Sequence, residues 1–396
     1  MSHEEASIKL HELHRGKIEV RSKVPLHNRL DLSTAYTPGV AEPCRRIARH
    51  PELVYRYTIK ANTVAIVSDG SAVLGLGNIG PLAAIPVMEG KALLFKAFAD
   101  VDAFPICLDT QNVDEIVETV ERIAPVFGGI NLEDISAPRC FEIERRLRKG
   151  LEIPVFHDDQ HGTAIVLLAA LTNACKLLDR GLDDLAVVIQ GAGAAGVAIA
   201  KLLLGIGIED GSVAPVREVI IVDSRGPLHR DRADLAAGSV KRQMAEITNP
   251  RQITGSLEEA LIGADAFIGV SVPDTVTPVM VASMAPDPII FALANPDPEI
   301  GYYEALEAGA AVAATGRSDY PNQINNVLAF PGVMRGALDA ESHKITEPMK
   351  VAAARAIASC VEQPRSDRII PDALDRQVPG RVAEAVRRVG DGEPAA

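Results

Sequence analysis

The chain has 396 residues, of which 47% are hydrophobic and 23% charged, and its formal net charge is −13. This length suits two domains, and this composition excludes a largely disordered chain. The negative charge argues against nucleic acid or an anionic membrane surface as a partner, because both attract clustered lysine and arginine. Five scattered cysteines without a CxxC pair, and an N-terminus without an apolar signal core, favour the cytoplasm.

The first half of the chain predicts an α/β domain. After a basic, turn-rich segment with a helix near residues 43–50, apolar runs of strand length recur along the sequence. Helical patterns such as 113–123 and 140–147 lie between several of them, and this alternation is typical of an α/β fold. The predicted strands are residues 63–67, 93–98, 105–108, 129–132 and 154–156.

The second half begins with a long predicted helix, residues 163–178, and then alternates again. Its apolar runs are short and rich in branched side chains, as in parallel strands buried on both faces. We therefore predict an α/β protein of two domains, residues 1–158 and 159–396, of which the second is a Rossmann-like parallel-sheet domain. Ligand sites favour the cleft at such a domain boundary. The predicted strands are residues 185–190, 218–222, 266–270, 289–294 and 311–314.

A glycine-rich motif follows the first predicted strand of the second domain and opens a helix. Gly191 permits a tight turn, Gly193 lets the backbone approach a pyrophosphate, and Gly196 lets helix and strand pack closely. The free N–H groups at the start of the helix attract phosphate. The residues that we predict to bind a dinucleotide here are Gly191, Ala192, Gly193, Ala194, Ala195 and Gly196.

Asp223 ends the next predicted strand and bears on which dinucleotide binds. Its carboxylate would accept hydrogen bonds from the ribose hydroxyls of NAD and would repel the 2′-phosphate of NADP. Arg225, two residues further on, could instead pair with that phosphate. We therefore favour NAD and leave NADP as the alternative.

Residues 75–80 also read GxGxxG, with Asp100 and Asp102 following at a plausible distance. Pro81 and Pro86 would interrupt the helix that a nucleotide site requires here, and no clean apolar strand ends at an acid. We therefore expect a backbone loop that lines the cleft rather than a second nucleotide site.

Two acidic pairs, Glu133-Asp134 and Asp158-Asp159, each follow a predicted strand of the first domain. The carboxyl ends of parallel strands share one edge of a sheet, and converging carboxylates repel one another unless a cation lies between them. Oxygen ligands suit Mg²⁺ or Mn²⁺, whereas the HDDQH run at 157–161 is a poor match to the zinc-protease motif. The alternative is that Asp158 and Asp159 only stabilise the start of the following helix.

Several ordered segments resemble the small bacterial malic enzymes, and together they extend over nearly the whole chain. Ordered motifs of this kind are far more specific than any one of them alone. The segments are YTPGVA (36–41), DGSAVLGLGN (69–78), EGK (89–91), NLED (131–134), HDDQHGT (157–163), ANP (294–296) and NN (325–326).

The resemblance implies oxidation of malate by NAD or NADP and its decarboxylation to pyruvate, with Mg²⁺ or Mn²⁺ as cofactor. Neutral Lys91 would take the proton of the C2 hydroxyl, and Tyr36 would protonate C3 of the resulting enol. We expect a homodimer or a higher homo-oligomer, in which a neighbour could supply part of a site. The residues carried over are Tyr36, Lys91 and Asp158 for catalysis, Glu133, Asp134 and Asp159 for metal, Gly75, Asn295 and Asn326 for substrate, and Asn295 also for cofactor.

Two positions depart from the family pattern. Ala72 stands where larger members of the wider family carry an arginine that holds a substrate carboxylate, and backbone N–H groups are expected to replace it. Asp100 stands where glycine is expected, which would perturb either the local backbone or the local charge.

Three other functions remain open on the sequence. A malolactic-type enzyme or oxaloacetate decarboxylase would keep the fold and change the product. Another two-domain dehydrogenase, such as an amino-acid dehydrogenase, would need no metal. A non-catalytic NAD-responsive binding protein would be expected to lack Lys91 or Tyr36, and both are present.

Overall fold

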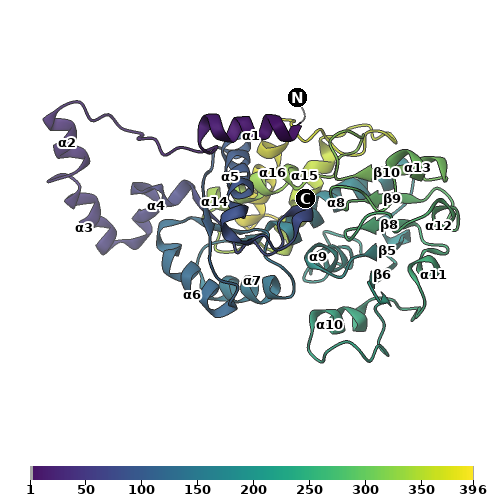
Figure 1. The fold of residues 1–396 in the computed structure, drawn as a ribbon. Helices are drawn as coiled ribbons and strands as arrows, with labels where there is room; N and C mark the ends of the chain where they lie inside the picture. The colour runs from purple at the N-terminus through teal and green to yellow at the C-terminus, as the bar shows by residue number, and fades with distance from the viewer. Residues whose placement is uncertain (1–2, 396) are drawn as a thin grey trace.

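Two β-sheets lie on either side of one long helix in the computed structural model, which describes residues 3–395 (Figure 1). The first sheet is parallel throughout, in the order β2-β1-β3-β4. Its strands are β1 (Thr63–Ser68), β2 (Asp102–Cys107), β3 (Gly129–Leu132) and β4 (Val155–His157).

The first sheet is covered on both faces because the side chains of its central strand alternate between them. Val64 and Ile66 of β1 face a cluster formed with helices α5 (Gly80–Ala99) and α8 (Asp158–Leu177). Ala65 and Val67 face a second cluster, which is formed with α6 (Val113–Ile123) and α7 (Arg139–Gly150). All four strand residues are fully buried, as parallel strands require.

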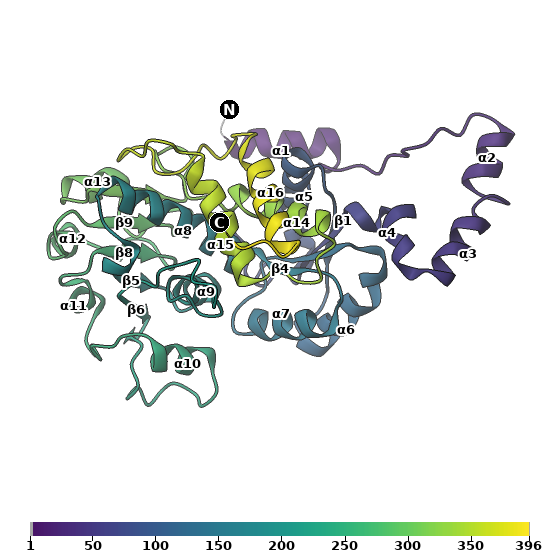
Figure 2. The same ribbon diagram turned by 180° about the vertical axis from the view of Figure 1, so that it is seen from behind.

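The second sheet has the order β10-β9-β8-β5-β6-β7 and is parallel except for β7, the short antiparallel edge strand. Helices α8 and α9 (Ala194–Leu203) cover one face. The other face is covered by α11 (Leu257–Leu261), α12 (Pro278–Ala282) and α13 (Tyr302–Glu307) (Figure 2). This is the predicted Rossmann-like arrangement. The strands are β5 (Ala186–Gln190), β6 (Glu218–Asp223), β7 (Gly226–Pro227), β8 (Ala266–Gly269), β9 (Ile289–Ala292) and β10 (Val312–Thr315).

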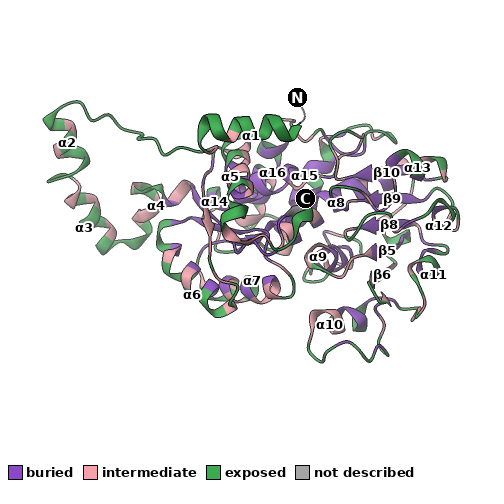
Figure 3. Ribbon diagram, viewed as in Figure 1, coloured by how far each residue is buried: buried purple, intermediate pink, exposed green. Residues whose placement is uncertain are grey.

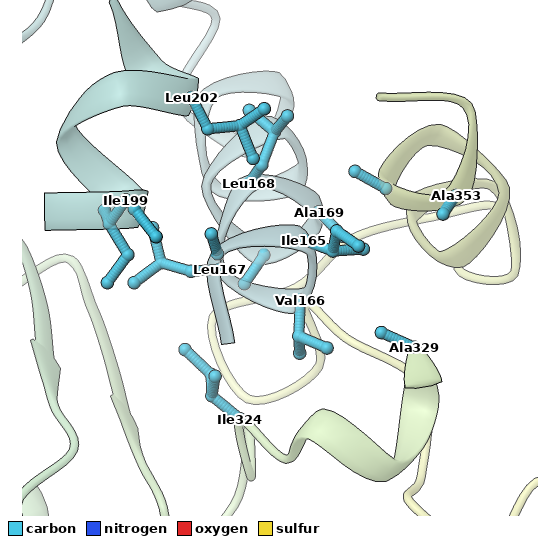
Figure 4. Packing of buried hydrophobic residues seen from close by; sticks show 14 of the residues in the cluster. Ile165, Val166, Leu167, Leu168, Ala169, Ile199, Leu202, Ile324, Ala329 and Ala353 are labelled. Atoms are coloured by element: carbon cyan, nitrogen blue, oxygen red, sulfur yellow. The ribbon is translucent and has the colours of Figure 1, made fainter. Parts of the chain in front are cut away.

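Helix α8 is buried along most of its length and joins the two halves of the core. Its apolar side chains point in every direction, toward Ile199 and Leu202 of α9 (Ala194–Leu203) and toward Ala353 of α15 (Glu347–Ser359) (Figure 4). A helix that is apolar all round is typical of the centre of a core. Each fully buried leucine of this kind contributes about 1.5–3 kcal/mol to folding.

The C-terminal helices pack back against the first half of the chain. The ring of Phe330, the first residue of α14 (Phe330–Asp339), lies 4.8 Å, centroid to centroid, from the ring of Phe95 in α5. The division of the chain at residues 158 and 159 therefore stays a prediction, because residues after 330 contribute to the packing of both halves. The remaining helices are α1 (His3–His14), α10 (Val240–Ile247) and α16 (Val378–Gly390).

An arm formed by α2 (Arg29–Ala35), α3 (Ala41–Arg49) and α4 (Val54–Tyr57) extends away from the two sheets (Figures 1 and 2). None of the residues in these three helices is buried. Figure 3 shows the arm almost entirely in the colours of exposed and half-exposed residues. The arm therefore has no core of its own in the single chain.

Two expectations about the segment after β1 are wrong. Residues 93–98 are not a strand but the last turns of α5, whose buried residues Ala84, Met88, Ala92 and Phe95 recur at helical spacing. The two prolines also do not interrupt this helix. Pro81 lies in its first turn, where no backbone donor is needed, and the exposed Pro86 removes only one helical hydrogen bond.

The structure explains Asp100, which follows α5 with a left-handed backbone (φ 51°, ψ 33°). Glycine commonly occupies this position at the end of a helix, because it adopts a left-handed backbone without a steric cost. Asp100 in place of glycine therefore affects the local backbone. Its carboxylate also lies 2.5 Å from Nζ of Lys96, one turn earlier.

Candidate active site

The two acidic pairs meet at the carboxyl edge of the first sheet, as predicted. Leu132 of β3 is paired with His157 of β4, so Glu133-Asp134 and Asp158-Asp159 leave adjacent strands at the same level. Carboxylate oxygens of Glu133, Asp134 and Asp159 lie within 4.8 Å of one another. Glu133 and Asp134 are buried.

These three carboxylates suit a divalent cation. Burial and the charges of Asp159 and Glu133 raise the pKa of Asp134 to about 8. Burial likewise raises the pKa of Glu133 and of Asp159. Oδ2 of Asp134 is buried and makes no hydrogen bond within residues 3–395. An oxygen-only donor set with an unsatisfied carboxylate oxygen matches the preferences of Mg²⁺ and Mn²⁺.

The alternative was that Asp158 and Asp159 only cap helix α8. Capping explains few of the hydrogen bonds that these two carboxylates make. His157 occupies the cap position and makes no side-chain capping bond. Oδ2 of Asp159 accepts a hydrogen bond from the backbone N–H of Asp134 at 2.9 Å, on the neighbouring strand. Asp158 is also bonded to groups outside its own helix.

Lys91 projects from α5 into this cluster and is 8% exposed. Its Nζ lies 2.8 Å from Oε1 of Glu133, 2.5 Å from Oδ2 of Asp158 and 4.2 Å from the ring centroid of Phe330. Burial alone would lower the pKa of Lys91, but the two carboxylates outweigh burial and raise that pKa. The lysine is therefore a charged group held between two acids.

Asp158 is fully buried and binds two of the predicted site residues. Oδ2 accepts hydrogen bonds from Nζ of Lys91 and from Nδ2 of Asn326. Burial raises the pKa of Asp158 to about 8 against the opposing effect of Lys91. A Cβ at Gly162 would lie 1.8 Å from Oδ1 of Asp158, so only glycine leaves room for this carboxylate.

Three neighbours of the site were not predicted from the sequence. Phe330 stacks on the amine of Lys91, and the buried amide of Asn131 donates to Oε2 of Glu133 at 2.8 Å. Gly162 makes room for Asp158. Asn131 and Gly162 lie inside recognised motifs, whereas Phe330 had no local signal because its role depends on the return of α14 to the first half.

A buried polar network beneath the carboxylates was also missed. Oε1 of Glu144 lies 2.6 Å from Nε2 of His161, and Nδ1 of His161 lies 3.0 Å from Nζ of Lys350. Lys350 also donates to Oε1 of Glu347 at 2.6 Å. The network connects α7, α8 and α15. His161 is therefore bonded to Glu144 and Lys350, and it lies outside the cluster of potential metal ligands among the described residues.

The loop at residues 75–80 lines the boundary between the two halves, as expected. A Cβ at Gly75 would lie 2.8 Å from the backbone oxygen of Asn295, so this glycine permits a close approach of the two loops. The backbone N–H of Ala72 donates to the backbone oxygen of Asp134 at 3.0 Å. It is therefore not available to replace the missing arginine.

The dinucleotide motif has the predicted geometry. Gly191 has φ 125°, and a Cβ there would lie 2.6 Å from the backbone oxygen of Val270. A Cβ at Gly196 would lie 1.8 Å from the oxygen of Gly191, whereas Gly193 has open space around it. A cavity of about 480 Å³ extends from Ala192 past Asp223 to α10. The motif thus offers an open backbone loop beside a cavity at the end of β6.

Tyr36 is the one predicted catalytic residue that the single chain does not bring to Lys91. It follows α2 on the arm and is 66% exposed. Both views place α2 far from α5, which carries Lys91 (Figures 1 and 2). Tyr36 and Lys91 therefore lie apart within one chain, and their pairing in catalysis stays a prediction.

A Rossmann-like dinucleotide domain beside a lysine–carboxylate site is the architecture of a two-domain, nicotinamide-dependent oxidoreductase. Residues 15–148 match the family model of the malic enzyme N-terminal domain, and residues 160–390 match that of the malic enzyme NAD binding domain. The chain therefore belongs to the malic enzyme family.

Relatives across the whole chain agree with this assignment. The bifunctional malic/malolactic enzyme of Bacillus subtilis is 55% identical over 98% of this chain and 93% of its own. The NAD-dependent malic enzyme of Geobacillus stearothermophilus is 57% identical over 94% of this chain and 76% of its own. The crystal structure of the NAD-dependent malic enzyme of Thermotoga maritima superposes with a TM-score of 0.91 at 50% identity, covering 96% of this chain and 98% of that one.

Within residues 3–395, no helix has the length and apolar character needed to cross a membrane.

Proposed function

We propose that this protein oxidises malate and decarboxylates the product to pyruvate, with NAD or NADP as hydride acceptor and Mg²⁺ or Mn²⁺ at Glu133, Asp134 and Asp159. The observation that carries the proposal is the position of Lys91. Its amine lies 2.8 Å from Glu133, one of the three converging carboxylates, and 2.5 Å from Asp158. Such a constellation places a proton acceptor beside a cation site.

In the proposed reaction, the C2 hydroxyl of malate loses its proton to Lys91 in its neutral form, and its carbon-bound hydrogen goes to the nicotinamide as hydride. Against the effect of burial, Asp158 and Glu133 raise the pKa of Lys91, and a divalent ion at the three carboxylates would offset their charge and favour the neutral amine. Asp158 and Glu133 hold the amine in place, and Asn326 holds Asp158. A divalent ion at the three carboxylates would act as a Lewis acid for the charge that develops on the substrate oxygen as CO₂ leaves. Tyr36 then delivers a proton to C3, which balances the proton taken at C2.

We propose that the Tyr36 of this reaction comes from a second copy of the chain. The arm exposes large apolar side chains, among them Leu30 at 74% and Leu32 at 47%, which a monomer rarely leaves clustered in solvent. In a symmetric dimer, each arm would cover apolar surface of its neighbour and bring Tyr36 to the neighbour's Lys91. Each active site would then be composed of both chains.

The test of the reaction is an assay of malate with NAD or NADP, in the presence of Mn²⁺ and after its removal with EDTA. We expect pyruvate and reduced dinucleotide in equal amounts, and loss of both without the metal. Formation of oxaloacetate without pyruvate, or activity that is indifferent to EDTA, would reject the proposal.

A second candidate is direct conversion of malate to lactate, because the Bacillus subtilis relative is named a bifunctional malic/malolactic enzyme. Such a reaction retains the reduced dinucleotide and uses it on pyruvate. Lactate that accumulates from malate without net reduced dinucleotide would favour it. Decarboxylation of added oxaloacetate is a partial reaction that the same site would support.

A further inference from the structure

We infer that the dinucleotide site selects NADP over NAD, through a basic pocket at the end of β6 that binds the 2′-phosphate with Arg225 and Lys241. This inference rests on the proposed function, because it names which dinucleotide serves the reaction. The sequence alone favoured NAD, on the premise that the carboxylate of Asp223 is free to bind ribose hydroxyls. The contacts of Asp223 remove that premise.

Asp223 is already saturated with hydrogen bonds. Its Oδ1 accepts from Nη1 of Arg232 at 2.8 Å and from the backbone N–H of Arg225 at 2.9 Å. Its Oδ2 accepts from Nζ of Lys241 at 2.7 Å and from Nη2 of Arg232 at 3.3 Å. A carboxylate has roughly four acceptor positions, and all are used here. The side chain is only 6% exposed, so ribose hydroxyls find neither space nor a free acceptor on it.

The charge of Asp223 is also neutralised. Burial would raise the pKa of this carboxyl, but the hydrogen bonds from Arg232 and Lys241 outweigh burial and lower the pKa, so it stays ionised and paired. Arg232 is 7% exposed and makes a bidentate pair with Asp234, whose Oδ2 also lies 3.1 Å from Nη1 of Arg225. The cluster has three cations and two carboxylates, so its net charge is one positive, whereas an unpaired Asp223 would give a negative charge. The cations are Arg225, Arg232 and Lys241, and the carboxylates are Asp223 and Asp234.

The cluster lines a cavity of about 480 Å³ that also contacts Ala192 of the glycine-rich loop. In a Rossmann-like fold the adenosine ribose lies at the end of this strand, beside the residue that corresponds to Asp223. Arg225 and Lys241 line the cavity and keep 70% and 42% of their side chains exposed. Their contacts leave N–H groups free on both side chains, because an ammonium has three donors and a guanidinium five.

The pocket therefore offers a phosphate two accessible cations and no unpaired carboxylate, whereas it offers the 2′-hydroxyl of NAD no unused acceptor on Asp223. Charge-assisted hydrogen bonds to phosphate are about twice as strong as neutral ones. An exposed 2′-phosphate thus gains more from this surface than a hydroxyl does.

The test compares two probes that differ only in the 2′-phosphate, adenosine 2′,5′-bisphosphate and 5′-AMP, by calorimetry on the full-length protein. We expect the bisphosphate to bind at least about tenfold more tightly, and kcat/KM with malate to favour NADP by a similar factor. Lys241→Ala and Arg225→Ala should each lower the NADP-to-NAD ratio of kcat/KM by about tenfold. Arg230→Ala, an exposed arginine that bonds to the backbone of Glu246, is the matched control and should leave the ratio unchanged.

Equal binding of the two probes, or a ratio that Lys241→Ala and Arg225→Ala do not change, would overturn the inference. The proposed function fails separately. If neither dinucleotide is reduced by malate while the bisphosphate still binds more tightly, the pocket assignment stands and the reaction is wrong. If malate reduces NAD alone and the probes bind equally, the reaction stands and the pocket assignment is wrong.

Discussion

Nζ of Lys91 lies 2.5 Å from Oδ2 of Asp158, and both groups are buried. The two residues are 67 positions apart in the chain, so the contact depends on the packing of α5 against the start of α8. Because Asp158 also binds Asn326, one carboxylate connects the proposed base to the short 3₁₀ helix (Asn326–Leu328) that precedes α14. The site is thus supported from both halves of the molecule.

Replacement of the lysine tests its role directly. Lys91→Ala should lower kcat for malate oxidation by at least about 10²–10⁴-fold, the usual contribution of a positioned base. Lys96→Ala is the control, because Lys96 lies on the same helix with its side chain 54% exposed, and its kcat should stay near that of the wild type. Thermal unfolding must show that both variants fold, since Lys91→Ala leaves two buried acids without their cation. Near-normal turnover of a folded Lys91→Ala protein would exclude the assignment.

Loss of one carboxylate should weaken metal binding. Asp159→Asn removes a charged ligand from the cluster, and we expect the dissociation constant for Mn²⁺ to rise by at least about 10–100-fold, as ligand-shell changes typically cause. Calorimetric titration with Mn²⁺ measures this without turnover. Glu118→Gln, an exposed acid on α6, serves as the matched control. Unchanged Mn²⁺ affinity in Asp159→Asn would mean that the acids serve the helix and not a metal.

Complementation tests whether Tyr36 and Lys91 act across a dimer. Tyr36→Phe and Lys91→Ala should each be nearly inactive alone. If subunits exchange at random, half of the dimers are mixed and each has one intact site, so the mixture should recover about a quarter of wild-type activity. Gel filtration of the wild-type protein gives the oligomeric state independently. No recovery, in a mixture shown to exchange subunits, would place both residues in one chain.

Asp100 offers a test of backbone strain. At φ 51° a glycine avoids the steric cost that any side chain carries, so Asp100→Gly should raise the free energy of unfolding by roughly 1 kcal/mol. The exposed pair with Lys96 contributes little that would be lost. Asp100→Ala keeps the strain and loses the polar side chain, and it should lower stability. Chemical denaturation of the three proteins compares them, and a less stable glycine variant would refute the explanation.

Glu144 predicts a pH dependence of stability. Burial would raise its pKa, but His161 and Lys350 outweigh burial and lower it from 4.5 to about 2. A carboxyl group whose pKa is lower in the folded state than in the unfolded state stabilises the fold when the pH is above the unfolded pKa. For Glu144 that stabilisation is lost as the pH falls from 4.5 toward about 2.

Glu144→Gln should therefore be less stable than the wild type at pH 7, and the difference should narrow below about pH 4.5. Denaturant unfolding at several pH values measures this difference. Glu142→Gln, on the exposed side of the same helix, is the control. The hydrogen bonds from Arg145 also lower the pKa of Glu142, but solvent screens this exposed pair, so its trend should be much smaller. A difference that stays constant from pH 7 to pH 3.5 would show that the ion pairs of Glu144 are not its source.

Local patterns in the sequence determined much of this protein. The Rossmann-like second domain, the glycine-rich loop at Gly191–Gly196 and the two acidic pairs after β3 and β4 were all predictable, because each depends on a strand and the few residues that follow it. The carboxyl ends of parallel strands necessarily share an edge, so the meeting of the acids was also predictable. The cytoplasmic location stays a prediction.

Only the tertiary structure decided which charges neutralise one another and which residues are too far apart to react. Arg232 and Lys241, from a loop and a helix further along the chain, bind the carboxylate of Asp223. Lys91 forms ion pairs with Glu133 and Asp158, which lie on other elements. Tyr36 lies on the arm, which extends away from the two sheets of its own chain (Figure 1). Electrostatic attraction depends on the distance between charges in space. The separation of two residues in the sequence does not give that distance, so these pairs became known only from the folded structure.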